Sequence, residues 1–559
     1  MNKPISLTGK TWRILGEKKP EESVFSAFCR IRNFSKEALS PPTLSDLADP
    51  KSLCGAEESA ERIFKAVKEG EKILVFGDFD LDGMSGSALL FHALRIIGAK
   101  ARVRLPSRAE GYGLSQTAYR EAKSAGETLV ITVDCGSKCA DTISFGNTLG
   151  IDTIVTDHHT LPEILPPVVA LLHPHLGNPK DDTWDITGAG VAFFLAMLLL
   201  QKTFSGKNID AILSQLLELA VLGTVADVGK LSGQNRIITH LGISHLRTTK
   251  HPGLKALLTS ARIRPEDVNA EAIAFFLAPR LNASGRLARP DISFELLVGD
   301  PRYSEEYAFL LEELNGKRRE ETDRLVQLAE KEIADAKAPA FCLFRKEFFS
   351  GVAGLVAARV AEKYHRPTVI LSKSDRLGFL TASCRGPEDF HFSHALSELG
   401  HLLEKWGGHA AAAGFSIKEE KCNTFREAFY KLAQTKRGSS PDGPSMEVDF
   451  FVEPEHFLEK DFSEVFSAEP FGAGNAAPIF GIQKIHLQEA RSVGQDKSHL
   501  AAEILHKSGR FSCIAFRFAD ILPENMRSVP LDILVSPEIR SWNGRREVRL
   551  KIVDARHPT

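Results

Sequence analysis

The sequence has no long apolar run, and this argues against a membrane protein. Its longest uncharged apolar stretch covers residues 188–200, whereas a membrane-spanning helix needs about 18–20 such residues. We therefore expect a buried core helix there and no membrane partner. Lys3 and Lys10 are not followed by an apolar segment, so no signal peptide is expected either.

Cysteines are few and irregularly spaced. There are eight in 559 residues, which argues against a secreted scaffold built on disulfides. The close pair Cys135 and Cys139 lacks a second Cys/His pair, so zinc is not expected. With no signal peptide, these features predict a cytoplasmic protein.

An excess of basic charge is also lacking. The formal net charge is −2, so any surface for nucleic acid must be local. The composition, 43% hydrophobic and 25% charged, is that of a soluble globular protein. Because 559 residues are too many for one core, three or four domains are expected.

What the sequence does contain is an acidic turn after an apolar segment. Residues 73–76 predict a buried strand, Asp78, Asp80 and Asp82 follow it at alternate positions, and residues 85–97 predict a helix. Carboxylates so close together repel one another unless a cation lies among them, and their oxygens suit Mg²⁺ or Mn²⁺. Taken alone, the acidic segment could equally be a solvated turn.

Two later apolar segments are also followed by potential metal ligands. Residues 129–133 predict a strand followed by Asp134, and residues 151–156 predict one followed by Asp157-His158-His159. Strands that alternate with helices predict a parallel sheet, and such sheets bind ligands beyond the carboxyl ends of their strands. The sequence therefore predicts a metal centre along this rim. Asp227 follows an apolar helix and is either a surface residue or an inward-facing ligand.

The C-terminal part has a different pattern. Residues 434–445 form a linker rich in Gly, Ser and Pro, after which short segments alternate apolar and polar residues. Asn543-Gly544 predicts a hairpin turn. Trp542 beside this basic turn suits either base stacking or capping of a small β-barrel core.

Four motifs of this chain resemble those of the DHH phosphoesterase superfamily. They are Gly-Asp-Phe-Asp-Leu-Asp-Gly (77–83), Val-Asp-Cys-Gly-Ser (133–137), Thr-Asp-His-His (156–159) and Gly-Thr-Val-Ala-Asp (223–227). Their order and spacing are similar to those of its RecJ branch, the single-strand-specific 5′→3′ exonucleases. Further segments that resemble this branch are residues 278–286, 351–359, 407–414 and 470–475.

The resemblance implies an α/β fold in which two α/β domains, DHH and DHH-associated, are joined by a long helix around a cleft. A C-terminal β-barrel of the oligonucleotide-binding type follows them. The expected divisions are an N-terminal arm (1–55), the DHH catalytic domain (56–240), a helical region with the long connector helix (241–337), the DHH-associated domain (338–434) and the oligonucleotide-binding fold (446–559).

The resemblance also implies the site residues. The expected metal ligands are Asp80, Asp82, Asp134, His158 and Asp227, with Asp78 as a further candidate. His159 and Asp134 are the expected catalytic residues, with Asp134 bridging two divalent ions. Asp157 would hold a histidine from behind. Mn²⁺ fits a mixed Asp/His site better than Mg²⁺, which remains the alternative.

Contacts to single-stranded DNA are assigned to Arg280, Asn282, Ser383, Arg385, His409 and Trp542. The glycine-rich segment before His409 could face a phosphate or be a tight turn on an alanine-rich helix. The chain departs from the family pattern at Phe348 and Phe349, where the family has Trp-His, and at Gly386. These departures bear on DNA contacts rather than on the metals.

The resulting prediction is a monomeric exonuclease that acts in DNA recombination and repair. A single-strand-binding protein and a helicase are candidate partners. One alternative is a phosphodiesterase for short oligonucleotides or cyclic dinucleotides. An alternative of another class is a non-catalytic single-strand-binding component of replication.

Overall fold

The computed structural model forms two compact units. The large unit comprises Pro42–Gly438 and Gly472–Asn475, and the small unit comprises Met1–Pro41, Ser439–Phe471 and Ala476–Thr559. The structure describes residues 4–35, 39–108, 110–111, 113–374, 376–437, 444–458, 464–494, 497–507, 509–522, 529–542 and 545–558. Much of the predicted linker, and the predicted turn at Asn543-Gly544, lie outside these residues.

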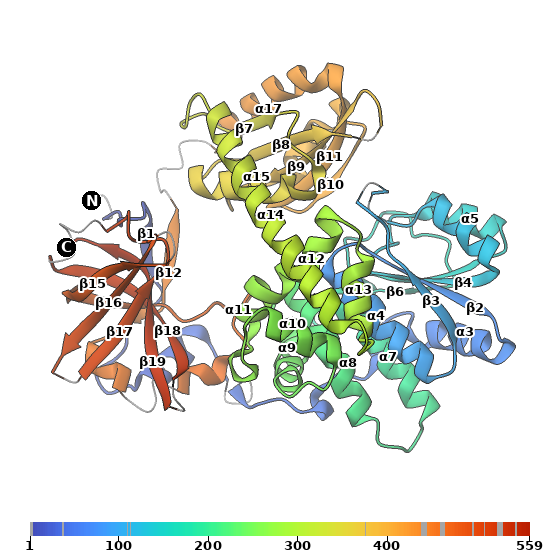
Figure 1. Ribbon diagram of the computed structural model, residues 1–559, viewed down its shortest axis with the longest axis horizontal. Coiled ribbons are helices and arrows are strands. Elements are labelled where there is room, and N and C mark those ends of the chain that lie inside the picture. Colours follow the sequence, from blue (N-terminus) through green and yellow to red (C-terminus); the bar gives the residue numbers. More distant parts are fainter. Residues whose placement is uncertain are drawn as a thin grey trace. The chain divides into compact units, whose positions relative to one another are not determined.

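The large unit begins with a parallel sheet of order β3-β2-β4-β5-β6 (Figure 1). Its strands are β2 (Lys72–Gly77), β3 (Lys100–Arg104), β4 (Glu127–Val133), β5 (Asp152–Thr156) and β6 (Ala170–Leu172). The connecting helices are α3 (Ala56–Glu69), α4 (Leu81–Ile96), α5 (Gln116–Ala125) and α6 (Ala140–Thr148). Alternate residues of β2 face opposite cores: Ile73 and Val75 lie in one cluster, Leu74 and Phe76 in the other.

Helices follow this sheet. They are α7 (Gly188–Thr203), α8 (Asp210–Ala226), α9 (Gly233–Leu246), α10 (Pro252–Ser260), α12 (Ala278–Leu287), α13 (Asp291–Val298) and the long α14 (Ser304–Glu332), with short turns between them. The apolar run of the sequence forms α7, which is buried from Gly188 to Leu200. Among the described residues no helix has the length and apolar character that a bilayer crossing requires.

Helix α14 leads to a second sheet, of order β10-β11-β9-β8-β7 (Figure 1). Its elements are β7 (Phe341–Phe344), α15 (Ser350–Tyr364), β8 (Thr368–Lys373), β9 (Phe379–Arg385), α16 (Phe392–Glu398), β10 (Lys405–Gly408), β11 (Ala412–Lys418) and α17 (Cys422–Arg437). The segment around His409 is the turn between β10 and β11, where His409 N–H donates to Ala412 O at 2.7 Å. The alanines that follow His409 lead into strand β11. The predicted tight turn is therefore present, but the prediction of an alanine-rich helix at these alanines is wrong.

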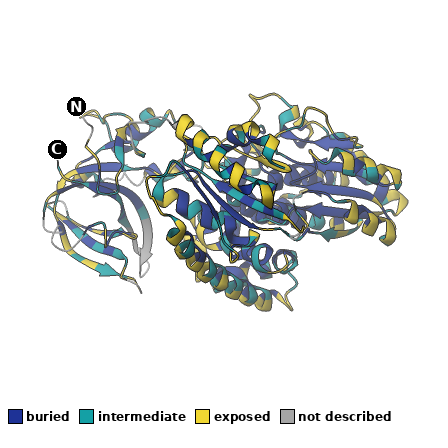
Figure 2. Cartoon of the chain, turned by 90° about the horizontal axis from the view of Figure 1, so that it is seen from above, coloured by how far each residue is buried: buried dark blue, intermediate teal, exposed yellow. Residues whose placement is uncertain are grey.

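The small unit is built around a seven-stranded sheet of order β13-β14-β18-β19-β17-β16-β15. Its strands are β13 (Phe450–Phe451), β14 (Phe480–Ile485), β15 (Leu487–Val493), β16 (His499–His506), β17 (Gly509–Ala515), β18 (Leu531–Trp542) and β19 (Arg545–Arg556). The inner strands β2, β4 and β5 of the first sheet are mostly buried (Figure 2), whereas β9 and β16 of the other two sheets alternate buried with more exposed residues.

The N-terminal segment packs within the small unit, which the sequence did not predict. Strand β1 (Thr11–Ile14) pairs in parallel with β12 (Ser445–Val448), and α1 (Val24–Arg32) contributes Phe28 to the core of the sheet. The Trp12 indole N–H donates to the buried carboxylate of Asp554 at 2.9 Å. Residues more than 500 positions apart in the sequence therefore close this unit together.

Candidate metal centre

The acidic turn lies at the carboxyl end of β2, where α4 begins. Helix α4 starts at Leu81, four residues earlier than expected, with Asp80 as its N-cap. The Asp80 carboxylate accepts the backbone N–H groups of Asp82, at 3.0 Å, and Gly83, at 3.3 Å. A helix N-terminus carries partial positive charge, so it stabilises carboxylates at this position.

Asp82 lies in the first turn of α4 and reaches a second helix. Its buried carboxylate accepts the N–H groups of Gly188, at 2.7 Å, and Ala189, at 2.9 Å, at the N-terminus of α7. Burial and the nearby Asp80 raise the pKa of Asp82 to about 7. The two backbone N–H groups therefore do not suffice to keep Asp82 ionised at neutral pH, and a nearby cation would be needed to do so.

Asp134 follows β4 with a left-handed backbone, φ 62°. A φ in this region is strained for a residue other than glycine and is concentrated at functional sites. Burial, with the Asp82 and Asp80 carboxylates next in effect, raises the pKa of Asp134. The centre thus places a buried carboxyl among other carboxyls, where ionisation requires a cation.

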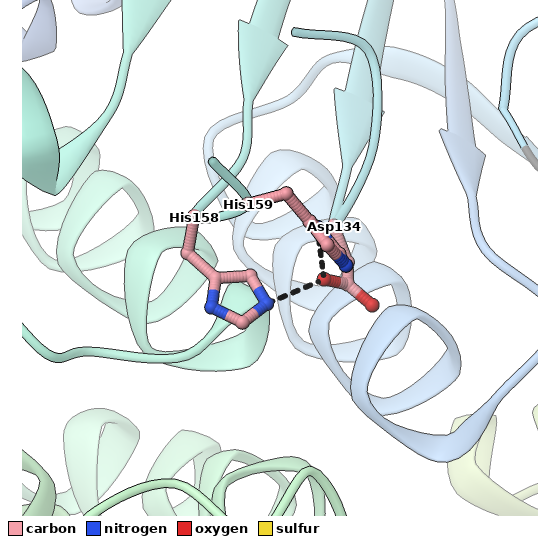
Figure 3. Close-up of side chains that lie close together, drawn as sticks. All are labelled: Asp134, His158 and His159. Atoms are coloured by element: carbon pink, nitrogen blue, oxygen red, sulfur yellow. Dashed lines mark ion pairs between the residues drawn. The ribbon is translucent and has the colours of Figure 1, made fainter. Parts of the chain in front are cut away.

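The two histidines after β5 turn toward Asp134 (Figure 3). The Oδ1 atom of Asp134 lies 3.1 Å from His158 Nε2 and 3.7 Å from His159 Nδ1. Burial lowers the pKa of His158 to about 3, which keeps its imidazole neutral. A neutral imidazole nitrogen is the form that binds metal ions.

His159 is held from behind by Asp157, as the sequence analysis expected. Its Nδ1 lies 2.8 Å from Asp157 Oδ1, and the other Asp157 oxygen accepts the Ser137 N–H at 3.0 Å. Burial alone would lower the pKa of His159, but the Asp157 carboxylate holds it above its ordinary value. Burial would raise the pKa of Asp157, yet the hydrogen bond from His159 holds it well below its usual range.

Asp227 joins this group from the end of α8. Its Oδ2 lies 3.8 Å from His158 Nε2, and its side chain is 33% exposed. Burial, with Asp82 and Asp80 next in effect, raises the pKa of Asp227 to about 8. Of the two roles that the sequence left open, the inward-facing one agrees with this position.

The side chains fit divalent cations. Three groups have ligand atoms within 4.8 Å of one another: Asp78, Asp80 and Asp134; Asp134, His158 and His159; and Asp82, His158 and Asp227. The buried Asp78 Oδ1 and His158 Nε2 make no hydrogen bond to any described residue. Oxygen and imidazole donors of this kind suit Mn²⁺ and, less well, Mg²⁺.

Two glycines allow the carboxylates to approach the helices behind them. A Cβ on Gly188 would lie 2.5 Å from Asp134 Oδ1, and a Cβ on Gly223 would lie 2.5 Å from Asp82 Oδ1. Gly188 opens α7 and Gly223 lies in the last turns of α8. Any larger residue at these positions would displace a predicted metal ligand.

The predicted DNA-binding residues fall into separate groups. The His409 ring stacks 6.3 Å from the ring of His159, next to the centre. Ser383 and Arg385 on β9 both face Gly354 of α15. The side chain of Trp542 lies outside the described residues.

Arg280 and Asn282, which remain predicted DNA contacts, also make contacts within the protein. Arg280 is buried, pairs with Glu312 and donates to Phe276 O at 2.7 Å. The Asn282 Oδ1 atom accepts the Leu81 N–H at 2.9 Å and so supports the start of α4.

A cluster of arginines lies beside the centre, and of its members the sequence analysis assigned Arg385 to DNA. Arg108 stacks on the Phe79 ring at 4.3 Å and donates to Gly285 O at 3.0 Å. Burial, with Arg108, Arg318 and Arg385 next in effect, lowers the pKa of Arg286 to about 9. The Arg286 guanidinium donates to a backbone carbonyl, that of Gly351, at 3.2 Å. Guanidinium groups gathered in this way favour an anion.

Comparisons with known proteins agree with the two-sheet and β-domain architecture. The DHH family N-terminal domain matches residues 72–224, the DHHA1 domain matches residues 337–435, and the RecJ OB domain matches residues 448–554. These three matches correspond to the first sheet, the second sheet and the C-terminal β-sheet. The expected fold class is confirmed.

Curated relatives carry the name single-stranded-DNA-specific exonuclease RecJ. That of Escherichia coli (strain K12) is 33% identical over 534 residues and that of Salmonella typhimurium is 32% identical over 536, each match covering 90% of both chains. That of Bacillus subtilis is 32% identical over 517 residues, 91% of this chain, but this chain spans only 64% of its length.

Solved RecJ structures have the same fold. The structure of RecJ from Thermus thermophilus with Mn²⁺ matches with a TM-score of 0.82 at 28% identity, covering 98% of this chain and 80% of that one. The structure of the same protein with Mg²⁺ matches with a TM-score of 0.77. By sequence identity and coverage together, this chain belongs to the RecJ family of the DHH phosphoesterases.

Proposed function

We propose that this chain is a metal-dependent exonuclease that degrades single-stranded DNA from 5′ to 3′. The observation that carries the proposal is the convergence of Asp and His side chains from the ends of β2, β4, β5 and α8 in a chain of the RecJ family. Strand ends along one edge of a parallel sheet are where such folds bind ligands.

The proposed metal ligands are Asp80, Asp82, Asp134, His158 and Asp227, with Asp78 as a sixth candidate. Asp134 belongs to two of the three groups whose atoms lie within 4.8 Å, which supports a bridging position between two ions. Two ions bound there supply a water of lowered pKa and stabilise the attacking and leaving oxygens of phosphodiester hydrolysis. Mn²⁺ is the proposed preferred ion, with Mg²⁺ as the alternative.

His159 is proposed to face the scissile phosphate. The Asp157 carboxylate favours its imidazolium form, because it raises the pKa of His159 through the 2.8 Å contact. A fixed positive charge beside the centre stabilises the charge that develops on the phosphate oxygens. His409, whose ring stacks on that of His159, is a proposed DNA contact beside it.

The arginine cluster is proposed to hold the DNA backbone near its 5′ end. Arg108, Arg286 and Arg385 are partly buried, and burial lowers the pKa of each. A phosphate placed among them would restore the charge balance. Contacts to phosphates carry no base information, which suits a nuclease that must accept any sequence. Ser383 beside Arg385 would add a neutral donor.

The rival activities have less support. A phosphodiesterase for short oligonucleotides has no need of the C-terminal β-sheet, which matches the RecJ OB domain over residues 448–554. A non-catalytic component has no need of a complete ligand set, yet carboxylate or imidazole groups occupy all five proposed ligand positions.

The finer assignments follow from the same proposal. We retain the divisions at residues 1–55, 56–240, 241–337, 338–434 and 446–559 as proposals, although residues 4–35 and 39–41 pack with the small unit.

An enzyme restricted to single strands requires another activity to open a duplex. A helicase and a single-strand-binding protein are therefore the proposed partners of a cytoplasmic monomer in recombination and repair.

The proposal is tested by substituting its bridging ligand. Asp134→Asn keeps the size of the side chain but removes its negative charge, and release of nucleotides from single-stranded DNA with Mn²⁺ should fall at least 100-fold, as expected for a two-metal centre. Arg289→Gln, at an exposed surface pair, is the matched control. Near-normal activity of a folded Asp134→Asn protein would contradict the bridging role.

A further inference from the structure

A short turn of the C-terminal region belongs to the large unit. Residues Gly472–Asn475 cluster with the large unit, although the chain on both sides of them belongs to the small unit. The turn is closed by two hydrogen bonds, from Gly472 N–H to Asn475 O at 2.8 Å and from Asn475 N–H to Gly472 O at 3.1 Å.

This turn is fitted closely to Leu231. The Leu231 N–H donates to Ala473 O at 2.7 Å, and its side chain is 4% exposed within the main core of the large unit. A Cβ on Gly472 would lie 2.7 Å from Leu231 Cδ1. No larger residue fits at Gly472 unless Leu231 moves.

Leu231 lies four residues after Asp227, and the segment between them is strained. Val228 has φ 60° and is 71% exposed. A left-handed backbone costs a β-branched residue about 1–2 kcal/mol, and such conformations persist only where neighbouring contacts enforce them.

Several contacts hold this segment, among them a hydrogen bond from the Val228 N–H to Val225 O at 3.2 Å. The Gly229 N–H donates to Thr224 O at 3.2 Å, and Lys230 pairs with Asp185 at 3.1 Å on the surface. Exposed ion pairs contribute little, so the hydrogen bond from the buried residue Leu231 to Ala473 is the stronger restraint on the C-terminal side of Val228.

We propose that the turn Gly472–Asn475 is a positioning element for the metal centre. It fixes Leu231, this residue enforces the left-handed backbone at Val228, and the Asp227 carboxylate is thereby held 3.8 Å from His158. The inference rests on the proposed role of Asp227 as a metal ligand.

The test is a titration of the full-length protein with Mn²⁺ in the absence of DNA. Gly472→Ala should weaken Mn²⁺ binding roughly 10-fold, as displacement of a supporting contact does in other metal sites. Leu231→Val removes the atom that the new methyl group meets, so the double variant should regain most of the affinity. Gly316→Ala is the control, because a Cβ there meets nothing within 4 Å.

A second comparison separates positioning of Asp227 from general loosening. In an Asp227→Asn background, Gly472→Ala should cause no further loss of Mn²⁺ affinity. An equal loss in both backgrounds, or wild-type affinity of a folded Gly472→Ala protein, would overturn the inference. If Gly472→Ala does not fold, Gly474→Ala strains the same turn at a left-handed glycine, φ 74°, and is judged by the same two criteria.

The outcome is independent of nuclease activity. If the wild-type protein binds Mn²⁺ but does not cut single-stranded DNA, the proposed function fails while the positioning role can still be measured. If it cuts DNA and Gly472→Ala leaves Mn²⁺ affinity unchanged, only the positioning role fails.

Discussion

Two glycines determine how closely carboxylates of the metal centre approach the surrounding helices. Gly188 and Gly223 lie against Asp134 and Asp82, each with an oxygen 2.5 Å from where a Cβ would be. Asp82 also accepts two backbone N–H groups of α7. The ligand geometry is therefore set by glycines as well as by acids.

Replacement of Gly223 should impair the centre without unfolding the protein. In Gly223→Ala the new methyl group displaces the Asp82 carboxylate, so Mn²⁺-dependent cleavage should fall roughly 10- to 100-fold. Mn²⁺ titration and nucleotide release measure the effect, with the open site Gly316→Ala as control. Unchanged Mn²⁺ affinity in a folded Gly223→Ala protein would exclude a role for Asp82 as a ligand.

At this scale the acids of the centre could be predicted, whereas the clustering of the arginines could not. Asp80, Asp134 and His158 follow apolar strands, and this local pattern is visible in the sequence. The sequence places Arg280 among the DNA contacts, but it does not reveal the pairing of Arg280 with Glu312, 32 residues later. Arg286 lies within a motif that resembles the RecJ branch, but only the fold brings it to Arg108 and Arg385.

At the scale of elements, the N-termini of helices position carboxylates of the metal centre. Helix α4 begins at Leu81 because Asp80 caps it and Asn282 accepts the Leu81 N–H. The expectation of a start at residue 85 was wrong, since Asp82 and Gly83, both weak helix formers, stand in the first turn of a helix that is buried over most of its length. Tertiary packing overrides weak helix propensity here.

Helix α8 carries a buried acid unrelated to the metals. Glu218 is 6% exposed and accepts a hydrogen bond from Thr249, and burial raises the pKa of Glu218 to about 7. Because this pKa is raised above that of the unfolded chain, the folded state binds more protons, and stability falls as pH rises from about 4.5 to 7.

Glu218→Gln should therefore remove part of this pH dependence. Glutamine keeps an acceptor for Thr249 but cannot ionise, so the variant should melt at a higher temperature than wild type at pH 8 and differ least at pH 5. Thermal unfolding at both pH values measures this. Equal melting differences at the two pH values would show that Glu218 does not titrate in the folded protein.

At the scale of the whole molecule, the small unit is assembled from both ends of the chain. Trp12 donates to Asp554, and the Arg556 guanidinium lies 4.1 Å from the Trp12 ring. Strands β7 and β8 of the second sheet were within reach of local patterns, because both are short apolar segments separated by a helix. The pairing of β1 with β12 was not, because 430 residues separate them.

Loss of the Trp12 hydrogen bond should destabilise the small unit alone. Trp12→Phe leaves a buried carboxylate of Asp554 with one donor fewer, at a cost of about 1–3 kcal/mol. Affinity for long single strands should fall, whereas cleavage of short oligomers should not. Arg13→Ala, at an exposed ion pair of the same strand, is the control. Equal losses on short and long strands would place the small unit within the catalytic machinery.

The most direct test of the central claim is digestion of one single-stranded oligonucleotide labelled at its 5′ end or its 3′ end, beside the same strand in a duplex, with Mn²⁺ present. A two-metal 5′→3′ exonuclease should release the 5′ label first as a mononucleotide, shorten the 3′-labelled strand progressively and spare the duplex. Asp134→Asn should do none of this. Early release of the 3′ label, or equal digestion of the duplex, would contradict the account.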